Sequence, residues 1–207
     1  MLTFWQRYKR NKSAVFGLGV ILLVIIMAVT ANFLYPFDPF RLAGKPLSGP
    51  GMNGFLLGSD SLGRDVAAGI VHGAKTSLLI GLIATLVAVF IGIVFGAFSG
   101  YYGGRLDDFL MRVTEIFQTI PSFIFAILLV AIMKPSIVSI VIAIAVVSWP
   151  GVARLVRGEF LALKNREFVQ ACHTLGMNDL RIMLREILPN CMSPIIVIGS
   201  LMVATAI

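Results

Sequence analysis

Charged residues are scarce in this sequence: only 13% of its 207 residues are charged, whereas 58% are hydrophobic. An average soluble domain is about 25% charged and about 45–50% apolar, so the composition excludes a soluble globular protein. The 17 basic residues outnumber the 10 acidic ones, but long uncharged stretches separate them, and nucleic acid requires a continuous basic patch. We therefore expect no nucleic-acid partner and a chain surrounded by membrane lipid.

Cysteine and histidine are also scarce, with two of each. Cys172, Cys191, His72 and His173 are too scattered for a disulfide framework or a four-ligand zinc site, so we expect no metal site and no cofactor bound by this chain. The long apolar runs hold no ionisable residue, although ion-coupled carriers keep such groups at mid-membrane. They also hold no nucleophile paired with a base. These absences argue against an ion-coupled carrier and against a membrane enzyme.

Five uncharged windows come close to or exceed the roughly 20 residues that a helix needs to cross a bilayer core, and they cover residues 13–37, 76–104, 116–133, 135–153 and 187–207. The break at residues 134–136 leaves room only for a tight turn, so the third and fourth windows predict a helical hairpin. The predicted fold class is an all-α membrane protein, a polytopic helical bundle with these five spans. Because the last window is still apolar where the sequence stops, we expect a C-terminally incomplete chain.

The basic residues favour one orientation in the membrane. With the N-terminus in the cytoplasm, five of them lie outside the cell: Arg41, Lys45, Arg64, Lys75 and Lys134. The other twelve then lie inside, which agrees with the positive-inside rule: Arg7, Lys9, Arg10, Lys12, Arg105, Arg112, Arg154, Arg157, Lys164, Arg166, Arg181 and Arg185. A cleaved signal peptide is the alternative for residues 1–35, but their apolar stretch exceeds the usual length of about 7–15 residues and no clear A-x-A site follows.

Residues 38–75, between the first two windows, are rich in turn residues and predict an external segment that ends in LLGSDSLGRDV. Turn chemistry is one interpretation of Asp60, Arg64 and Asp65, with Gly63 at a bend. A functional external surface is the other.

The second window carries small residues at intervals of four, namely Ala88, Gly92, Gly96 and Gly100. One face of this helix is therefore nearly bare of side chains, and such a face allows another helix to approach closely. We expect a helix-packing surface there, formed with this chain or with another subunit.

The segment 151–190 holds the most informative pattern. Gly176 offers the left-handed conformation that ends many helices, and Asn178 or Asp179 can cap a second helix. Before Gly176, four residues fall at i, i+3, i+4 and i+7 and so share one helix face: Phe168, Ala171, Cys172 and Leu175. The sequence predicts a helix–Gly–helix elbow, which suits either a groove in a partner protein or the lipid surface.

Residues 170–189 resemble the EAA motif of permease subunits of bacterial ATP-binding-cassette importers, whose pattern is E-A-A, three residues, G, nine residues and I-x-L-P. Four residues match in register, namely Ala171, Gly176, Leu188 and Pro189. Three residues depart from the pattern: Gln170 replaces the Glu, Cys172 the second Ala and Glu186 the Ile.

Seven further segments resemble, in order, the dipeptide/oligopeptide/nickel branch of these permeases, and within it the second, C-type subunit: RYKRNKSAVFGLGVILL, YPFDPF, LLGSDSLGRDV, GAKTSLLIGL, GYYGGRLDDFLMRVTEIF, IPSF and SWPGVARLVRGEFLALKNREFVQA. The resemblance runs from residue 1 to residue 207, and LGSDSLGRD is particular to that branch. Members of the family finish the fifth span and add a sixth.

The resemblance implies the type I permease fold of ATP-binding-cassette importers. Its parts would be a cytoplasmic tail at residues 1–13, a first span at 14–37, a periplasmic segment at 38–75 and a permease core at 76–207. A coupling elbow at 154–186 would seat in a cleft of a cytoplasmic ATPase. The residues of 167–189 that would dock there are Gln170, Ala171, Cys172, Leu175, Gly176, Leu188 and Pro189.

The function implied is that of a non-catalytic permease subunit in the bacterial plasma (inner) membrane, which forms half of a path for short peptides, nickel complexes or other small solutes. The partners implied are a homologous second permease, two cytoplasmic subunits that bind ATP and Mg²⁺, and a periplasmic or lipid-anchored substrate-binding protein that faces residues 38–75. The alternative is a membrane channel or carrier that works without ATP.

Overall fold

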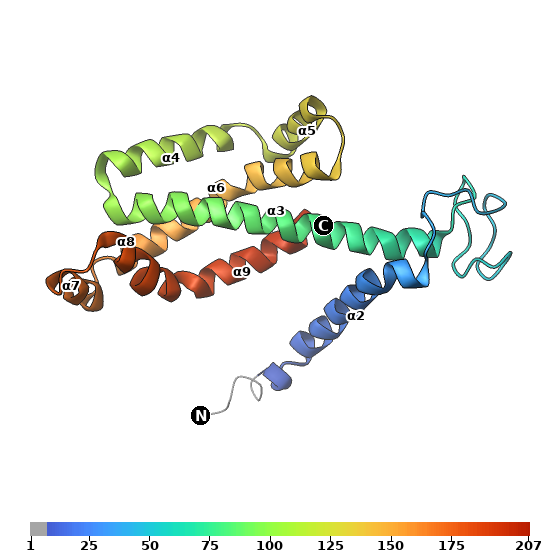
Figure 1. Cartoon of the computed structure of the whole chain (residues 1–207), viewed down its shortest axis with the longest axis horizontal. Helices are drawn as coiled ribbons and strands as arrows, with labels where there is room; N and C mark the ends of the chain where they lie inside the picture. The colour runs from blue at the N-terminus through green and yellow to red at the C-terminus, as the bar shows by residue number, and fades with distance from the viewer. Residues whose placement is uncertain (1–7) are drawn as a thin grey trace. The chain divides into compact units, whose positions relative to one another are not determined.

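A computed structural model describes residues 8–207, and every regular element in these residues is a helix (Figure 1). The predicted all-α class is confirmed. Arg7 and the residues before it in the predicted cytoplasmic tail lie outside the described range. The elements are, in chain order, α2 (Lys12–Leu34), α3 (Val66–Tyr102), α4 (Gly104–Thr119), α5 (Ser122–Met133), α6 (Ile137–Leu163), α7 (Glu167–Thr174), α8 (Asp179–Ile182), the π-helical turn η1 (Met183–Ile187) and α9 (Leu188–Ala206).

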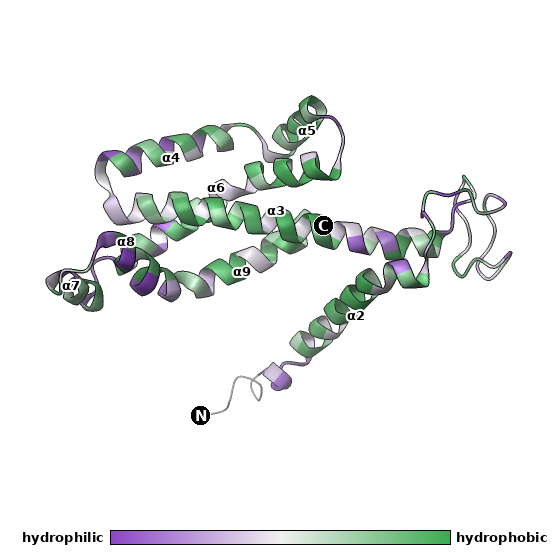
Figure 2. Cartoon of the chain, in the orientation of Figure 1, coloured by the Kyte–Doolittle hydropathy of each residue, from purple (hydrophilic) through white to green (hydrophobic). Residues whose placement is uncertain are grey.

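Four helical stretches in the described residues are long and apolar enough to cross a membrane, or five if the bent pair α4 and α5 makes one span. They are α2, α3, α6 and the stretch Asp179–Ala206, which joins α8, η1 and α9. Apolar residues dominate α2, α3, α5, α6 and α9 (Figure 2), and many large side chains on them are exposed, such as Phe33 at 88%. Surfaces of this kind require lipid or other helices around them. The chain is a multi-pass membrane protein.

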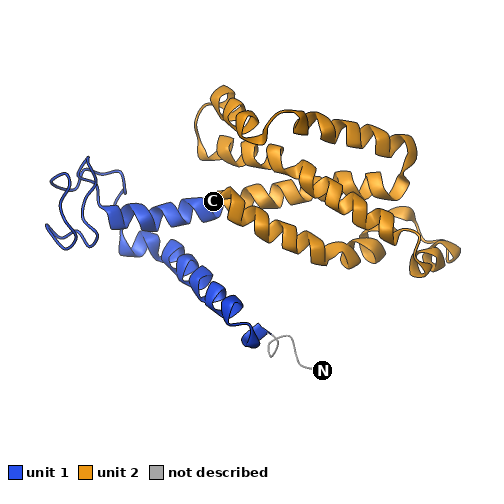
Figure 3. Cartoon of the chain, turned by 180° about the vertical axis from the view of Figure 1, so that it is seen from behind, with its two compact units in different colours: residues 1–79 blue, residues 80–207 orange. Residues whose placement is uncertain are grey.

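The chain divides into two compact units, one that ends at Leu79 and one from Ile80 to Ile207 (Figure 3). In the first unit, α2 has 23 residues and rises about 35 Å, which is enough to cross a bilayer core of about 30 Å. Two hydrogen bonds tie α2 to α3. Lys75 Nζ donates to Asn32 Oδ1 at 3.1 Å, and His72 Nε2 donates to the carbonyl oxygen of Tyr35 at 2.9 Å.

Turn chemistry accounts for the acidic residues of the connecting segment 35–65. The Asp60 carboxylate accepts a hydrogen bond from the backbone N–H of Arg64 at 2.8 Å, and Gly63 between them has a φ of +76°. The Asp65 carboxylate accepts one from the N–H of Ala67 at 2.8 Å, at the start of α3. Because backbone donors, above all the N–H of Arg64, stabilise the ionised form, the pKa of Asp60 lies below its ordinary value. The interpretation of Asp60 and Asp65 as turn residues is confirmed.

Helix α3 begins at Val66, although the uncharged window begins only at Thr76. Lys75 is half-buried within the helix, and its ammonium group bonds to Asn32, so it limits the apolar stretch without ending the helix. The 37 residues of α3 rise about 56 Å. This length exceeds a bilayer core of about 30 Å, so α3 extends beyond the membrane.

The predicted span over residues 116–133 is not one continuous helix. Helix α4 ends at Thr119, α5 begins at Ser122, and the two are bent by 84° relative to each other. Pro121 causes the break, because proline lacks the N–H for a helical hydrogen bond and disfavours the helical conformation in the residue before it. Ile120 is accordingly extended, with φ −90° and ψ 130°. Alone, α5 rises only about 18 Å, which is too short to cross.

The predicted hairpin is confirmed between α5 and α6, which pack against each other. Lys134 makes the tight turn with a φ of +69°. The Ser136 side chain then accepts a hydrogen bond from the N–H of Ser139 at 3.0 Å, and Ser139 Oγ accepts one from the N–H of Ser136 at 2.9 Å. This reciprocal capping box starts α6.

The core of the second unit lies where α3 meets α6. The structure places the bare face of α3 against α6: a Cβ built on Gly96 would lie 2.4 Å from the Ala153 carbonyl oxygen, and one on Gly100 would lie 2.8 Å from that of Arg157. The two backbones are therefore in direct contact, as helices with small interfacial residues allow. Buried apolar side chains complete this core: Ala97, Val152, Val156, Phe160, Val169, Ile182, Met183, Ile187, Cys191 and Ile195.

Candidate functional site

The elbow, residues 167–189, is a helix–turn–helix at one end of the second unit (Figure 1). After α7, Gly176 adopts a φ of +73°, and the N–H of Met177 donates to the carbonyl of Cys172 at 3.1 Å, as in a Schellman motif. Asn178 Oδ1 then accepts from the N–H of Leu180 at 3.0 Å and caps α8. The predicted elbow, with its glycine end and Asn178 cap, is confirmed.

Buried apolar residues fasten the elbow to the bundle. Val169, Ile182 and Ile187 have no exposed surface and share one core with Phe160 of α6. Beyond α8 the chain remains helical: η1 closes with a bond from the N–H of Leu188 to the carbonyl of Met183, five residues back. Helices α8, η1 and α9 form one 28-residue helical stretch, so the elbow continues without a break into α9.

The predicted apolar face of α7 faces mainly outward. Leu175 is 80% exposed and Phe168 is 38% exposed, Ala171 is exposed, and only Cys172 is half-buried. Val169, on the neighbouring face, is the residue that α7 buries. The helix therefore has two apolar faces, one that packs on this chain and one that is exposed.

The remaining predicted docking residues lie on both sides of Gly176. Gln170 is exposed, as is Gly176 itself, and a Cβ on Gly176 would meet nothing within 4 Å. Leu188 is half-buried and Pro189 is exposed at the start of α9. The structure thus brings Gln170, Ala171, Leu175 and Gly176 together on the surface of the elbow, while Leu188 and Pro189 lie where the elbow continues into α9.

Tyr101, near the end of α3, contacts both elbow helices. Its hydroxyl donates to Asp179 Oδ1 of α8 at 2.9 Å and lies 3.4 Å from His173 Nε2 of α7, and its ring stacks on that of His173 with centroids 6.4 Å apart. Lys164 Nζ donates to the Tyr101 carbonyl oxygen at 3.3 Å. Sequence reasoning missed this residue, because no local pattern relates Tyr101 to partners more than 70 residues away.

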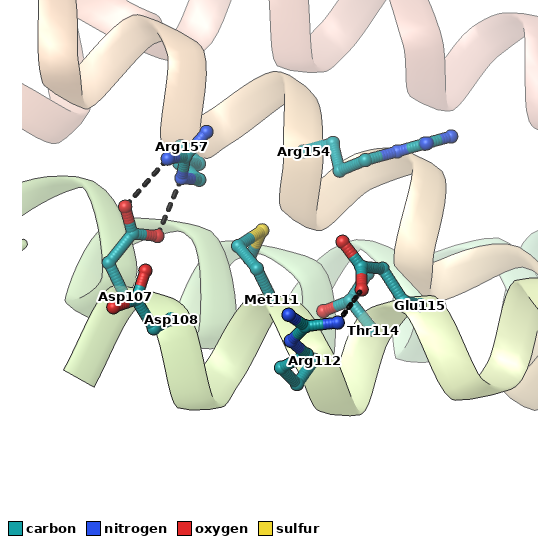
Figure 4. Close-up of a pocket in the computed structure, with 8 residues that line it drawn as sticks. All are labelled: Asp107, Asp108, Met111, Arg112, Thr114, Glu115, Arg154 and Arg157. Atoms are coloured by element: carbon teal, nitrogen blue, oxygen red, sulfur yellow. Dashed lines mark hydrogen bonds and ion pairs between the residues drawn. The ribbon is translucent and has the colours of Figure 1, made fainter. Parts of the chain in front are cut away.

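A charged groove of about 630 Å³ lies between α4 and α6 (Figure 4). On one side of it, Asp107 accepts two parallel hydrogen bonds from Arg157, from Nε and from Nη2, each at 2.6 Å, and a third from Ser99 Oγ. Such bidentate pairs are strong and geometrically specific. They join α3, α4 and α6 at one point. Sequence reasoning also missed this ion pair.

The rest of the groove is more open to solvent. Arg112 and Glu115 form an ion pair at 3.6 Å, but their side chains are 82% and 65% exposed, so it contributes little to stability. Arg154 lines the same groove from α6. Within residues 8–207 no cluster of three or more His, Cys, Asp or Glu could hold a metal ion.

Residues 92–207, which contain the whole elbow and the whole groove, match the family of binding-protein-dependent transport system inner membrane components. The chain belongs to this family. Residues 2–49 of this family member also match the N-terminal transmembrane domain of oligopeptide transport permease C. The resemblance drawn from the EAA-like motif and the seven segments is confirmed.

Curated relatives of this inner membrane component align with nearly its whole length. The dipeptide transport system permease protein DppC of Bacillus subtilis is 39% identical over 203 residues, which are 98% of this chain and 63% of the relative. The oligopeptide transport system permease protein OppC of the same organism is 36% identical over 100% of this chain and 69% of the relative. The glutathione transport system permease protein GsiD of Pectobacterium atrosepticum is 37% identical over 99% and 68%. The chain thus spans 63% to 69% of the length of these relatives.

Proposed function

We propose that this protein is the non-catalytic permease subunit of an ATP-driven importer and forms half of the translocation path for short peptides. The observation that carries the proposal is the elbow, which the bundle anchors through Val169 and Ile182 while Leu175 and Gly176 remain exposed. Membership of the transport family supports it. Relatives named for dipeptides, oligopeptides and glutathione favour short peptides as the cargo.

The proposed mechanism is a rigid-body movement of helices. The elbow would lie in a cleft of a cytoplasmic ATPase subunit, and the ATPases would draw the elbows together when they bind ATP. The continuity of α8, η1 and α9 would carry this displacement into the bundle and turn the path from inward-facing to outward-facing. The driving force would be the difference in ATP affinity between the two conformations.

The assembly that this mechanism requires contains a homologous second permease and two ATPase subunits that bind ATP and Mg²⁺. In this assembly the protein would lie in a bacterial inner membrane, with its N-terminus and its elbow on the cytoplasmic side, as the distribution of basic residues favours. Residues 38–75 then face a periplasmic or lipid-anchored substrate-binding protein. The exposed apolar side chains of that segment, Phe40 at 71% and Leu56 at 71%, suit a protein contact.

Purification of the tagged full-length protein in mild detergent tests the proposal. Mass spectrometry should find two kinds of partner, nucleotide-binding ATPase subunits and a second permease. The reconstituted complex should take up short peptides only when ATP and the substrate-binding protein are present. A chain that purifies alone as a homo-oligomer, and transports without ATP, would instead indicate a channel or carrier.

A pair of substitutions at Leu175 tests the elbow itself. Leu175→Gln removes the apolar contact of a side chain that is 80% exposed in the free chain, so it should leave stability unchanged. Because burial of a leucine contributes about 1.5–3 kcal/mol, and 1.4 kcal/mol is about tenfold in affinity, the variant should bind the ATPase at least about tenfold more weakly. The matched variant Leu175→Met keeps an apolar side chain of similar size and should bind like wild type. Equal affinity of both variants would exclude Leu175 from the docking surface.

A further inference from the structure

Polar contacts between the elbow and the rest of the bundle converge on one side chain. Among residues 8–207, each side-chain hydrogen bond that joins α7 or α8 to another helix has the Tyr101 hydroxyl as a partner, through Asp179 at 2.9 Å and His173 at 3.4 Å. Apolar packing of Val169, Ile182 and Ile187 also joins the elbow to the bundle. Apolar packing is non-directional, whereas a hydrogen bond depends steeply on angle. The Tyr101 hydroxyl therefore fixes the rotation of α7 and α8 relative to α3.

The position of Tyr101 is itself fixed. One residue earlier in α3, a Cβ on Gly100 would lie 2.6 Å from Phe160 Cβ and 2.8 Å from the Arg157 carbonyl oxygen, so this end of α3 touches the backbone of α6. Lys164, just after α6, also donates to the Tyr101 carbonyl. A force applied to Asp179 through the hydroxyl is consequently transmitted to α3 and α6 together.

We propose that Tyr101 is a positioning residue of the importer, which transmits displacement of the elbow from α8 to α3 and thereby couples ATP hydrolysis to transport. The inference depends on the proposed function. In this arrangement the continuity of α8 with α9 supplies one route from the elbow into the bundle, and the Tyr101 hydroxyl supplies a second route, into α3 and α6. Without the hydroxyl, α8 moves with α9 while α3 stays behind, so ATP is hydrolysed without a complete change of conformation.

The test uses the full-length protein with its partner subunits in proteoliposomes. Tyr101→Phe removes only the hydroxyl, and Tyr102→Phe is the matched control, since Tyr102 is next in sequence and its ring packs on Phe98 and Tyr101. A single hydrogen bond biases an equilibrium by about fivefold. We expect Tyr101→Phe to lower the peptide transported per ATP hydrolysed by about fivefold, while the amount of assembled complex and its basal ATPase rate stay at wild-type levels. Tyr102→Phe should leave all three quantities unchanged.

A second pair of variants changes the acceptor. Asn keeps an oxygen that accepts from the tyrosine, so Asp179→Asn should retain coupling, whereas Asp179→Leu should lower it as Tyr101→Phe does. If Tyr101→Phe reduces assembly, this pair of Asp179 variants still shows whether the hydrogen bond between Tyr101 and Asp179 is needed for coupling. Coupling at wild-type level in Tyr101→Phe, or equal coupling in the two Asp179 variants, would overturn the inference.

Hydrogen exchange of the purified chain gives a readout that needs no transport. Backbone amides of α7 and α8 should exchange about fivefold faster in Tyr101→Phe than in Tyr102→Phe. Equal exchange would overturn the positioning role of the hydroxyl. Absence of ATP-driven uptake by the wild-type complex would refute the proposed function separately, and the two failures are therefore distinguishable.

Discussion

A single methyl group placed between α3 and α6 tests the packing on which the bundle depends. In Gly96→Ala the added carbon would lie 2.4 Å from the Ala153 carbonyl oxygen, 2.7 Å from Val156 Cβ and 2.9 Å from the backbone nitrogen of Arg157. Carbon–oxygen contacts between packed helices are about 3.3–3.6 Å. Two of the three neighbours are backbone atoms, which cannot rotate aside, so α3 and α6 must separate by about 1 Å.

The free energy of this change follows from three quantities. A gap of about 0.5–1 Å loses a quarter to a half of the dispersion energy of the atoms that it separates. Insertion of a methyl group into a packed core costs about 1–3 kcal/mol, and the backbone contacts at Gly96 place it near the upper value. The higher helix propensity of alanine restores at most about 1 kcal/mol. We therefore expect Gly96→Ala to lower the free energy of unfolding by about 2 kcal/mol.

The control is Gly158→Ala in α6, where an added carbon would meet nothing within 4 Å. That variant should be as stable as wild type or up to about 1 kcal/mol more stable. Both can be compared by reversible unfolding of the full-length protein with SDS in mixed micelles, followed by circular dichroism. If Gly96→Ala proves as stable as Gly158→Ala, the backbones of α3 and α6 are not in contact at Gly96, and the argument fails.

Three further predictions concern the groove, the elbow and the connecting segment. Asp107→Asn and Arg157→Lys should each lower the free energy of unfolding in the same assay by about 1–3 kcal/mol. The double variant should lose less free energy of unfolding than the sum of the two single losses. Additive losses would mean that the two residues do not interact. Gly176→Trp places a side chain at a φ of +73° and should lower the free energy of unfolding by only about 1–2 kcal/mol. Because the large side chain should prevent docking, we expect uptake to be lost while membrane insertion is kept. Retained uptake and ATPase stimulation would contradict the docking role. Because the folded-state pKa of Asp60 is lowered, its stabilisation is present above the unfolded-state value of about 3.9 and lost as pH falls through the folded-state pKa. Hydrogen-exchange protection of the Arg64 amide should therefore decrease in acid in wild type but not in Asp60→Asn, and constant protection in wild type would contradict the assignment.

The features that could be predicted from the sequence are those set within a few residues. Uncharged windows predicted the apolar helices because the burial of a charge in lipid is costly. Gly176 and Asn178 predicted the elbow because a left-handed glycine and a capping asparagine act on the adjacent turn. The break between α4 and α5 was equally local, since Pro121 stands in the middle of the window. The break was missed because the window was defined by hydropathy alone, without the restriction that a proline places on the conformation of the residue before it.

The contacts that could not be predicted join residues far apart in the chain. Asp107 and Arg157 are separated by 50 residues, and Tyr101 and Asp179 by 78. A charged residue at the end of an apolar window has the same local pattern whether it faces water or an ion pair. Only the close approach of α3 and α6 at Gly96 and Gly100, followed by the return of the chain through the elbow, brings these partners together.

The burial pattern of α7 bears on whether the elbow suits a groove in a partner protein or the lipid surface, the two alternatives that its periodicity left open. A helix that lies on lipid turns its widest apolar face to the acyl chains and is polar elsewhere. In α7 one apolar face, with Val169, is already covered by Phe160 and Ile182 of the same chain, and the face left exposed alternates Phe168, Ala171 and Leu175 with polar Gln170 and Thr174. Eight residues rise only about 12 Å, which leaves a small, mixed surface beside a glycine turn. Such a surface suits a cleft in a partner protein better than a lipid headgroup layer, because the cleft can satisfy the polar side chains while it buries the apolar ones.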